Sequence, residues 1–494
     1  MTDLIIRNIN EVYLQIDCED SVSYELNEFF AFRVIGAEFS PKYRARLWNG
    51  MIHLFSIKTR QIYRGLLPQI IKFFEDRSYS YTYEYEEYNN EFSLNEAKQF
   101  IKTLNLKIEP RDYQIDAFVH TIRNKRSLLL SPTASGKSLI IYLIIRYLYE
   151  RQNIRKFLII VPTVSLVSQL YSDFSDYGFD SDTYVHRIFS GQDKETDKPI
   201  VISTWQSLFK LPKKYFESFE TVVGDEAHLY KAKSLTDIMT NLINAKYRIG
   251  TTGTLDGTKT NKLVLEGLFG SVNKVTTTKK LMDQKHIADF SIKCLVLKHN
   301  DNICQAAKNF TYPQEIEYLV LNEDRNKFIT NLALSLEGNT LLLYQYVDKH
   351  GKILYDMISK RINDSRSLSD DRKVFFISGD VDAEIREETR KIVENEQRSI
   401  IVASFGTFST GTNIRNLHNI IFASPSKSRI RNLQSIGRGL RKSETKSNAV
   451  LFDIADDLRY KKHDNYTLKH FALRLKIYSE EQFKFKIFKI SLRC

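Results

Sequence analysis

The stretch from Ser127 to Ile145 predicts a strand, a loop and a helix in immediate succession. An apolar run ends at Leu130, small residues follow, and a second apolar run long enough for a buried helix begins at Leu139. This order places the backbone N–H groups of the loop at a helix N-terminus, where anions bind. The segment therefore favours a parallel α/β sheet with a phosphate site at the end of one strand.

The loop itself has the features of a P-loop, whose backbone surrounds the phosphates of a nucleotide. Lys137 is expected to reach the β- and γ-phosphates, and the Ser138 hydroxyl is expected to coordinate Mg²⁺. Ser131 stands where such loops usually have their first glycine, so further signals are needed. The predicted phosphate-binding residues are Ser131, Pro132, Thr133, Ala134, Ser135, Gly136, Lys137 and Ser138.

A pair of carboxylates after a later strand supplies the second signal. The run Thr221 to Gly224 leads directly into Asp225 and Glu226, at the edge of the sheet where the strands of an α/β protein place their chemistry. Asp225 would hold magnesium through water, and Glu226 would orient and deprotonate an attacking water. An Asp-Glu pair that only caps a helix is the alternative. The phosphate loop in the same chain disfavours that alternative.

Composition narrows the class of partner. The 494 residues carry a formal net charge of +12, which favours a polyanion, and nucleic acid is the leading candidate. The four cysteines are scattered without metal-ligand spacing and are too few for a disulfide framework, so a cytoplasmic location is expected. The sequence shows neither a signal peptide nor a membrane span, and we expect a soluble protein with no membrane partner.

Residues 1–107 are expected to form a small α+β accessory domain. Between Phe39 and Phe74 seven basic residues and no acidic residue alternate with aromatic side chains. Cations for phosphates and aromatic rings for stacking suit a nucleic-acid contact, with Lys42, Arg44 and Arg46 as candidates. A module with an aromatic core and a solvated basic edge explains the stretch equally well.

The alternation of strands and helices predicts one α/β lobe over residues 108–280 and a second over residues 281–457. Residues 458–494, with ten Lys or Arg and three acidic residues, are expected to form a short basic helical extension. The second lobe has no phosphate loop, but Arg438 and Arg441 would share one helical face. In a two-lobed ATPase this pair would point to the γ-phosphate, whereas solvated surface arginines are the alternative.

Together these motifs resemble the superfamily 2 helicases. Arg111 to Gln114 resembles the adenine-reading element of that family, in which Gln114 would bond the adenine edge. Thr252 to Thr254 stands where the family couples the ATP state to its grip on DNA, although the family usually has Ser-Ala-Thr there. The resemblance implies that the backbone of a DNA strand is contacted by Pro162, Thr163, Thr204, Trp205, Ser378, Gly379, Thr410 and Thr412. It also implies that Arg111 and Gly411 contact the nucleotide and that Gln434 is catalytic.

The resemblance implies two tandem RecA-like lobes, ATP and Mg²⁺ as cofactors, and DNA as the partner. A narrower resemblance, to the recombination and repair helicases of T-even phages, rests on Phe39 to Gly50 and on Val275 to Met282. It implies remodelling of branched DNA in recombination, repair and replication, which comprises junction migration, fork regression and the unwinding of RNA–DNA hybrids. We expect a monomeric or weakly associating enzyme in the cytoplasm of the host cell.

Two other functions fit parts of the sequence. A restriction-type translocase would move along duplex DNA without separating the strands, but it usually adjoins nuclease or methylase segments, and the sequence has no such motif. An ATP-independent nucleic-acid scaffold would retain the nucleotide motifs only as relics. Intact Lys137, Asp225 and Glu226 argue against the scaffold.

Overall fold

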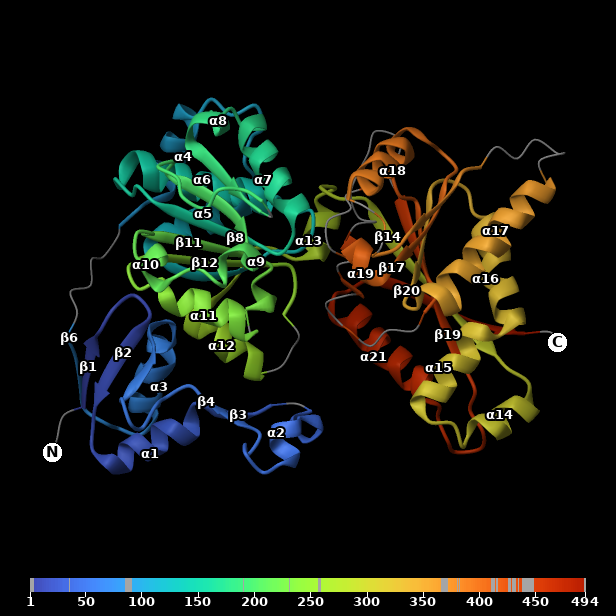
Figure 1. Ribbon diagram of the computed structural model, residues 1–494, viewed down its shortest axis with the longest axis horizontal. Helices are drawn as coiled ribbons and strands as arrows, with labels where there is room; N and C mark the ends of the chain where they lie inside the picture. The colour runs from blue at the N-terminus through green and yellow to red at the C-terminus, as the bar shows by residue number, and fades with distance from the viewer. Residues whose placement is uncertain are drawn as a thin grey trace. The chain divides into compact units, whose positions relative to one another are not determined.

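The computed structural model describes residues 4–34, 36–84, 91–189, 191–230, 232–255, 259–365, 372–379, 381, 383–409, 414, 416–424, 428, 432–433, 435–437 and 448–492. Contacts within the chain define two compact units (Figure 1). The first comprises residues 1–131 and 136–275, and the second comprises residues 132–135 and 276–494.

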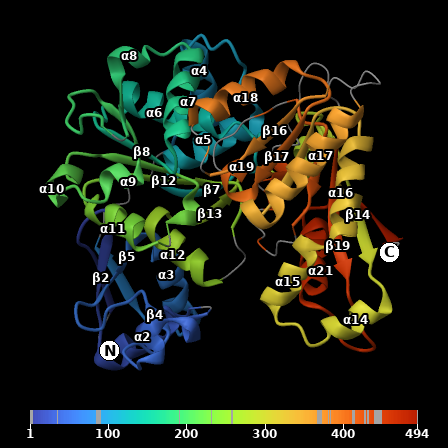
Figure 2. The ribbon, with the colours of Figure 1, turned by 45° about the vertical axis from the view of Figure 1, so that its right-hand side comes forward.

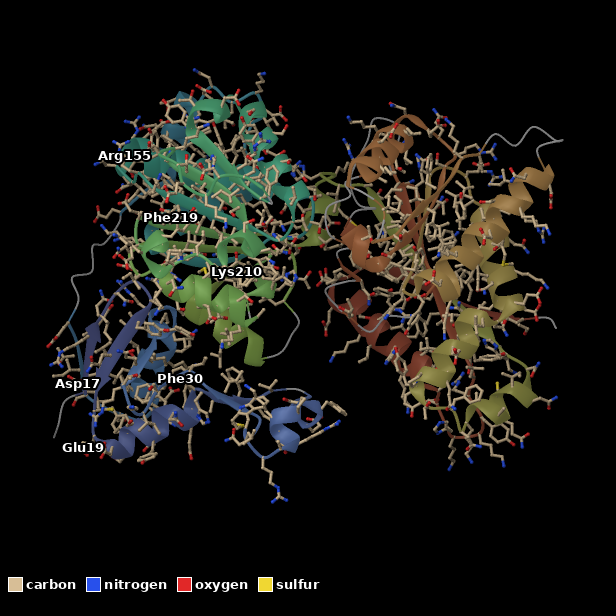
Figure 3. The ribbon with its side chains drawn as sticks, viewed as in Figure 1. Asp17, Glu19, Phe30, Arg155, Lys210 and Phe219 are labelled. Atoms are coloured by element: carbon tan, nitrogen blue, oxygen red, sulfur yellow. The ribbon has the colours of Figure 1, made fainter. Side chains whose placement is uncertain are left out.

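The first unit begins with a small mixed sheet in the order β5-β2-β1-β6, in which β1 pairs antiparallel with β2 and parallel with β6. Helices α1 and α3 cover it, and Phe30, labelled in Figure 3, is buried with Phe73 between them and the sheet. This confirms a small α+β domain at the N-terminus. Its elements are β1 (Leu4–Asn8), β2 (Tyr13–Asp17), α1 (Asp20–Phe29), β3 (Ala31–Arg33), α2 (Pro41–Arg44), β4 (Met51–His53), β5 (Gln61–Tyr63), α3 (Leu67–Asp76) and β6 (Tyr81–Glu84), with short 3₁₀ turns at Ala37–Phe39 and Arg64–Leu66.

An antiparallel hairpin of β3 and β4, with α2 at its end, extends from α1 away from the four-stranded sheet (Figure 1). We call residues 31–34 and 36–53 the basic projection. Trp48 donates a hydrogen bond from Nε1 to the carbonyl of Met51 at 2.7 Å, so this indole closes the hairpin. Tyr43 is held by Arg33, whose Nη2 donates to the tyrosine hydroxyl at 3.1 Å. Two of the aromatic residues in the basic stretch are therefore parts of the hairpin's own structure.

The main sheet of the first unit has seven parallel strands in the order β13-β7-β12-β11-β8-β10-β9. Successive residues of β8 face opposite layers, because Ile159 packs with α4 to α7 while Leu158 and Ile160 pack with α9 to α12. Figure 2 shows these helix layers on the two sides of the strands. The elements are α4 (Leu94–Thr103), α5 (Asp112–Asn124), β7 (Arg126–Leu130), α6 (Lys137–Arg151), β8 (Phe157–Val161), α7 (Val164–Asp176), α8 (Ser181–Tyr184), β9 (Val185–Ile188), β10 (Ile200–Thr204), α9 (Trp205–Leu208), α10 (Lys213–Phe216), β11 (Thr221–Asp225), a 3₁₀ turn (Ala227–Leu229), α11 (Lys233–Asn241), β12 (Tyr247–Thr252), α12 (Lys259–Phe269) and β13 (Val272–Lys274).

Close packing and buried charge fasten the small domain to this sheet. A Cβ atom at Gly65 would lie 2.1 Å from the backbone oxygen of Glu266 in α12, so only glycine permits this approach. Oε2 of Glu11 lies 2.6 Å from Nη1 of Arg64 and 2.7 Å from Nη2 of Arg126. The backbone N–H of Glu11 donates a hydrogen bond to the carbonyl of Ile243 at 3.0 Å. Since Arg126 begins β7, the small domain is attached to the strand that leads into the phosphate loop.

Arg248, in β12, is the most deeply buried cation near this junction, with 1% of its surface exposed. Burial lowers the pKa of its guanidinium to about 9. The side chain donates to three carbonyls at distances of 2.7–2.9 Å, those of Met239, Leu242 and Leu268, at the ends of α11 and α12. Arg248 therefore caps two helices that meet the sheet.

Replacement of Arg248 by methionine is expected to destabilise the first unit by about 3 kcal/mol. Three buried carbonyls would lose their donors at about 1–3 kcal/mol each, and relief from burying the cation offsets part of this cost. The midpoint of urea unfolding of the first unit, followed by hydrogen exchange of its backbone amides, measures the change. Arg155→Met, at an exposed position labelled in Figure 3, is the control. An unchanged midpoint for Arg248→Met would contradict the capping role.

The second unit is built on another seven-stranded parallel sheet, in the order β16-β17-β15-β18-β19-β14-β20. Apolar side chains of α16 and α17 form a core against β15, β17 and β18. Two RecA-like lobes are thereby confirmed. The elements are α13 (Thr278–Asp283), β14 (Asp289–Lys298), α14 (Asp301–Ala307), α15 (Tyr312–Leu321), α16 (Glu323–Ser335), β15 (Thr340–Tyr344), a π-helical turn (Val347–Gly351), α17 (Lys352–Ser365), β16 (Val374–Ile377), α18 (Ala383–Asn395), β17 (Ile400–Ser404), α19 (Phe405–Ser409), β18 (Asn419–Phe422), β19 (Asn448–Asp457), α21 (Tyr466–Glu480) and β20 (Lys484–Ser491).

The basic C-terminal extension is more than a helix. Helix α21 docks on β19, because the buried Asp453 accepts hydrogen bonds from Arg474 at 2.9 Å and from the Tyr478 hydroxyl at 2.8 Å. The strand β20 then pairs in parallel with β14 and adds an edge to the sheet. Among the helices that the structure describes, none is both long and apolar enough to cross a membrane.

Candidate functional site

The predicted phosphate loop connects β7 to α6, and its backbone has a shape suited to an anion. Ala134 and Gly136 both have left-handed backbones, with φ of 67° and 78°. Residues of this kind alternating with right-handed ones turn successive N–H groups toward one side and form an anion-binding concavity. A Cβ atom at Gly136 would lie 2.3 Å from Nε2 of Gln114, so a larger residue here would displace the Gln114 amide from the loop.

Gln114 lies directly against this loop. Its Oε1 accepts a hydrogen bond from the N–H of Arg111 at 2.8 Å, and its Nε2 donates to the carbonyl of Gly136 at 3.4 Å. Arg111 in turn donates from Nη1 to the Tyr113 hydroxyl at 2.8 Å. The structure therefore places the predicted adenine-reading residues beside the phosphate loop.

Lys137 and the two carboxylates predicted to act with it come together. Strands β7 and β11 are separated only by β12, and their carboxyl ends lie on one edge of the parallel sheet. The Lys137 ammonium is 3.9 Å from Oδ1 of Asp225 and 3.5 Å from Oε1 of Glu226. Thr251, in β12, donates from its hydroxyl to the same Oδ1 of Asp225 at 2.6 Å. The structure thus brings the predicted cation and the predicted carboxylate pair together at one edge of the sheet.

Glu226 occupies a strained backbone position, with φ of 50°. Such left-handed conformations of residues other than glycine are concentrated at functional sites. Burial opposes ionisation of this carboxyl, but the Lys137 ammonium and then His228 outweigh burial and hold the pKa of Glu226 well below its usual value. Nδ1 of His228 lies 3.3 Å from Oε2 of Glu226 and 3.0 Å from the Thr252 hydroxyl. The carboxylate is thus ionised and linked to the strand that carries Thr252.

The hydroxyl of Ser138 lies 2.9 Å from the hydroxyl of Tyr177, the residue that ends α7. Tyr177 comes 39 residues after Ser138 and belongs to no motif, so no local signal in the sequence predicts it as a site residue. Burial raises the pKa of its phenol to about 12. The side chain is therefore a neutral hydrogen-bonding group at the edge of the site.

The side chains present fit a magnesium ion bound together with a nucleotide. The predicted ligands, the Ser138 hydroxyl and the Asp225 carboxylate, are hard oxygen donors. Within the described ranges no group of three or more His, Cys, Asp or Glu side chains could hold a metal by itself. Mg²⁺ is commonly held by one or two protein oxygens together with substrate phosphates, so this donor set suits it better than a dedicated metal cage.

Four of the predicted strand contacts lie on the same edge of the first sheet. Pro162 and Thr163 follow β8, while Thr204 is the last residue of the neighbouring strand β10 and Trp205 follows it. The Thr204 hydroxyl is buried and 3.0 Å from that of Ser207. The two pairs are therefore neighbours in space.

The other predicted nucleic-acid contacts that the structure describes lie in the second unit and on the basic projection. In the second unit Ser378 and Gly379 follow β16, where Ser378 is buried and Gly379 is exposed. On the basic projection Lys42, Arg44 and Arg46 are all exposed. The remaining predicted residues, Thr410, Gly411, Thr412, Gln434, Arg438 and Arg441, fall outside the described residues.

Two family models match the chain. Residues 107–257 match the model described as "Type III restriction enzyme, res subunit". Residues 3–84 match "DNA helicase UvsW, N-terminal". The second match covers the small N-terminal domain with its basic projection, and the first covers much of the sheet that carries the phosphate loop.

Whole-chain comparisons agree with the models. The "ATP-dependent DNA helicase uvsW" of Enterobacteria phage T4 is 35% identical over 503 residues, which cover 97% of this chain and 98% of the relative. The crystal structure of T4 UvsW matches with 33% identity, a TM-score of 0.53 and 100% coverage of both chains. A fragment of a putative HsdR subunit of a type I restriction enzyme from Vibrio vulnificus YJ016 has a TM-score of 0.60 at 17% identity, over 80% of this chain and 71% of that one, and shows the fold alone. These findings confirm the resemblance inferred from the motifs. The chain belongs to the UvsW family of ATP-dependent DNA helicases.

Proposed function

We propose that this helicase remodels branched nucleic acid by coupling hydrolysis of Mg²⁺–ATP to movement along DNA. The main support for an ATP site is that the Lys137 ammonium lies 3.5–3.9 Å from the carboxylates of Asp225 and Glu226 at one edge of the sheet. The adjacent loop has the left-handed backbone positions of a phosphate-binding loop. Junction migration, fork regression and the unwinding of RNA–DNA hybrids are the proposed reactions, carried out by a monomer or a weakly associating protein.

The site residues of the first unit then have separate roles in hydrolysis. The Lys137 ammonium leaves the two carboxylates and contacts the terminal phosphates, where it balances their charge. Glu226, ionised and free of its cation, accepts a proton from the attacking water. Magnesium, when bound with the nucleotide, stabilises negative charge on the transferred phosphoryl group. Asp225, oriented by Thr251, is positioned to hold that ion.

Catalytic and nucleotide-binding roles are also proposed for residues of the second lobe, as the helicase resemblance implies. We propose that Arg438 stabilises the transition-state charge of the phosphoryl group, that Arg441 and Gln434 are catalytic, and that Gly411 contacts the nucleotide. Gln114 and Arg111 read the adenine. The predicted DNA-backbone contacts are Pro162, Thr163, Thr204, Trp205, Ser378, Gly379, Thr410 and Thr412.

The basic projection supports the choice of a branched substrate. It exposes Lys42, Arg44 and Arg46 on a hairpin that is held away from the small sheet. The domain that carries it is fastened to the first lobe through Glu11, Arg64 and Arg126. We propose that this cationic hairpin holds a duplex arm while the lobe to which its domain is attached moves along a strand.

Changing Lys42, Arg44 and Arg46 together to alanine is expected to weaken binding to forked DNA and to leave ATPase activity on saturating single strands nearly intact. Each lost phosphate contact should reduce the slope of log affinity against log salt by about 0.9 on B-form DNA. Fluorescence anisotropy at several salt concentrations measures the affinity for forked DNA and its salt slope. A turnover assay measures the ATPase activity.

The control for this triple variant is Lys98, Lys102 and Lys107 changed to alanine, which removes the same charge from exposed positions on or just after α4. Equal losses on forked and single-stranded DNA, or the same slope change in the control, would leave the projection without a specific role.

A restriction-type duplex translocase is the second candidate, and the match of residues 107–257 to a type III restriction subunit favours it. ATPase activity with single-stranded, duplex, forked and hybrid substrates tests the choice. Remodelling of branches predicts strongest stimulation by forks. Stimulation by linear duplex alone would favour the second candidate.

A further inference from the structure

Tyr177 places a phenol hydroxyl against the residue proposed to ligate magnesium, at a distance of 2.9 Å from Ser138 Oγ. The ring lies among other aromatic side chains, with its centroid 5.2 Å from that of Tyr142 on α6. Phenylalanine would fill such a place equally well, as Phe174 and Phe179 do beside the same Tyr142. Packing therefore explains the ring of Tyr177 but not its hydroxyl.

The hydrogen bond between Tyr177 and Ser138 can fix the direction in which the Ser138 hydroxyl points its proton. A serine hydroxyl has one proton and two lone pairs, and a cation attracts the lone pairs and repels the proton. In the part of the chain that the structure describes, Tyr177 is the hydrogen-bond partner of the Ser138 hydroxyl. When the Ser138 proton is donated to Tyr177, both lone pairs of Ser138 Oγ stay available on its other side. The phenol oxygen of Tyr177 can accept this bond, because a hydroxyl oxygen carries two lone pairs.

We propose that Tyr177 is a positioning residue for the magnesium site: its hydroxyl accepts a hydrogen bond from Ser138 and so directs the lone pairs of the serine oxygen toward the cation that accompanies the nucleotide phosphates. Groups that orient a metal ligand in this way affect metal affinity although they never touch the metal. Tyr177 directly follows the last residue of α7 and lies outside the phosphate loop. The inference rests on the proposed Mg²⁺–ATP site.

The test is the binding of ADP by the full chain, measured by calorimetry in Mg²⁺ and again in EDTA. In Tyr177→Phe the magnesium concentration that half-maximally strengthens ADP binding should rise by about tenfold, the lower end of the usual effect of such partners. ADP affinity in EDTA should equal that of the wild type, which also shows that the variant is folded. Tyr171→Phe is the control, because it removes a phenol of the same helix that instead bonds the exposed Asp182.

A double-mutant cycle separates positioning from general loosening. In a Ser138→Ala background, Tyr177→Phe should cause no further change in the magnesium dependence, because the group through which it acts is gone. An additive loss, an equal loss in EDTA, or an unchanged magnesium dependence of Tyr177→Phe would each overturn the inference while leaving the nucleotide site standing. A wild-type chain whose ADP binding ignores Mg²⁺ would overturn the proposed magnesium site together with this inference.

Discussion

Replacement of Lys137 by alanine is expected to lower DNA-stimulated ATP turnover by about 10³-fold or more, an effect typical of the charged groups that stabilise phosphoryl transfer. The structure shows why one side chain has so large an effect. The ammonium is the cation within 4 Å of both Asp225 and Glu226 in the described part of the site. Without it, the terminal phosphates would lose the cation proposed to balance their charge, and the two carboxylates would lose their shared ion-pair partner. Turnover at saturating ATP and DNA measures the loss.

Lys246→Ala, at an exposed position before β12, is the matched control and should retain wild-type turnover. DNA binding by Lys137→Ala should persist, because the predicted DNA contacts lie on other strands and on the basic projection. Turnover within a few-fold of the wild type would remove Lys137, and with it the loop, from the proposed site.

Glu226→Gln is expected to bind ATP and hydrolyse it about 10²–10⁴-fold more slowly, the usual contribution of a general base. The amide keeps the size of the side chain, but it cannot accept a proton from water. Because the glutamine side chain has no titratable group, raising the pH should not rescue the variant. Rapid quench and nucleotide-binding measurements separate chemistry from affinity.

Glu217→Gln, at an exposed position before β11, controls for the loss of one negative charge. If Glu226→Gln failed to bind nucleotide, the carboxylate would be a structural partner of Lys137 and His228, and another group would have to serve as the base.

Local sequence was sufficient to predict the parts of the site that each occupy a few consecutive residues. The loop before Lys137 and the pair Asp225–Glu226 follow apolar strands directly, so the rule that parallel strands end at one edge places them together. The structure brings these groups within 4 Å. Their roles in ATP hydrolysis stay predictions.

Partners distant in the chain could not be predicted in this way. Tyr177 meets Ser138 only because α7 packs beside α6, and Arg248 reaches carbonyls at the ends of two helices whose positions depend on the whole sheet. The edge strand β20 could have been predicted from the sequence, because basic and apolar residues alternate at Lys484, Phe485 and Lys486 as they do in a strand. The helical spacing of the apolar residues Leu468, Phe471, Leu475 and Tyr478 predicts α21 alone and gives no sign of the strand after it.

The central claim, that hydrolysis of ATP drives the remodelling of branched DNA, is tested most directly by following a labelled synthetic fork in a gel assay with the wild-type chain. The account predicts that the fork is converted to regressed and unwound products with ATP, and that no conversion occurs with a non-hydrolysable analogue or with Glu226→Gln. Conversion without hydrolysis would contradict the account, and so would rapid ATP turnover on the fork that leaves every strand paired as before.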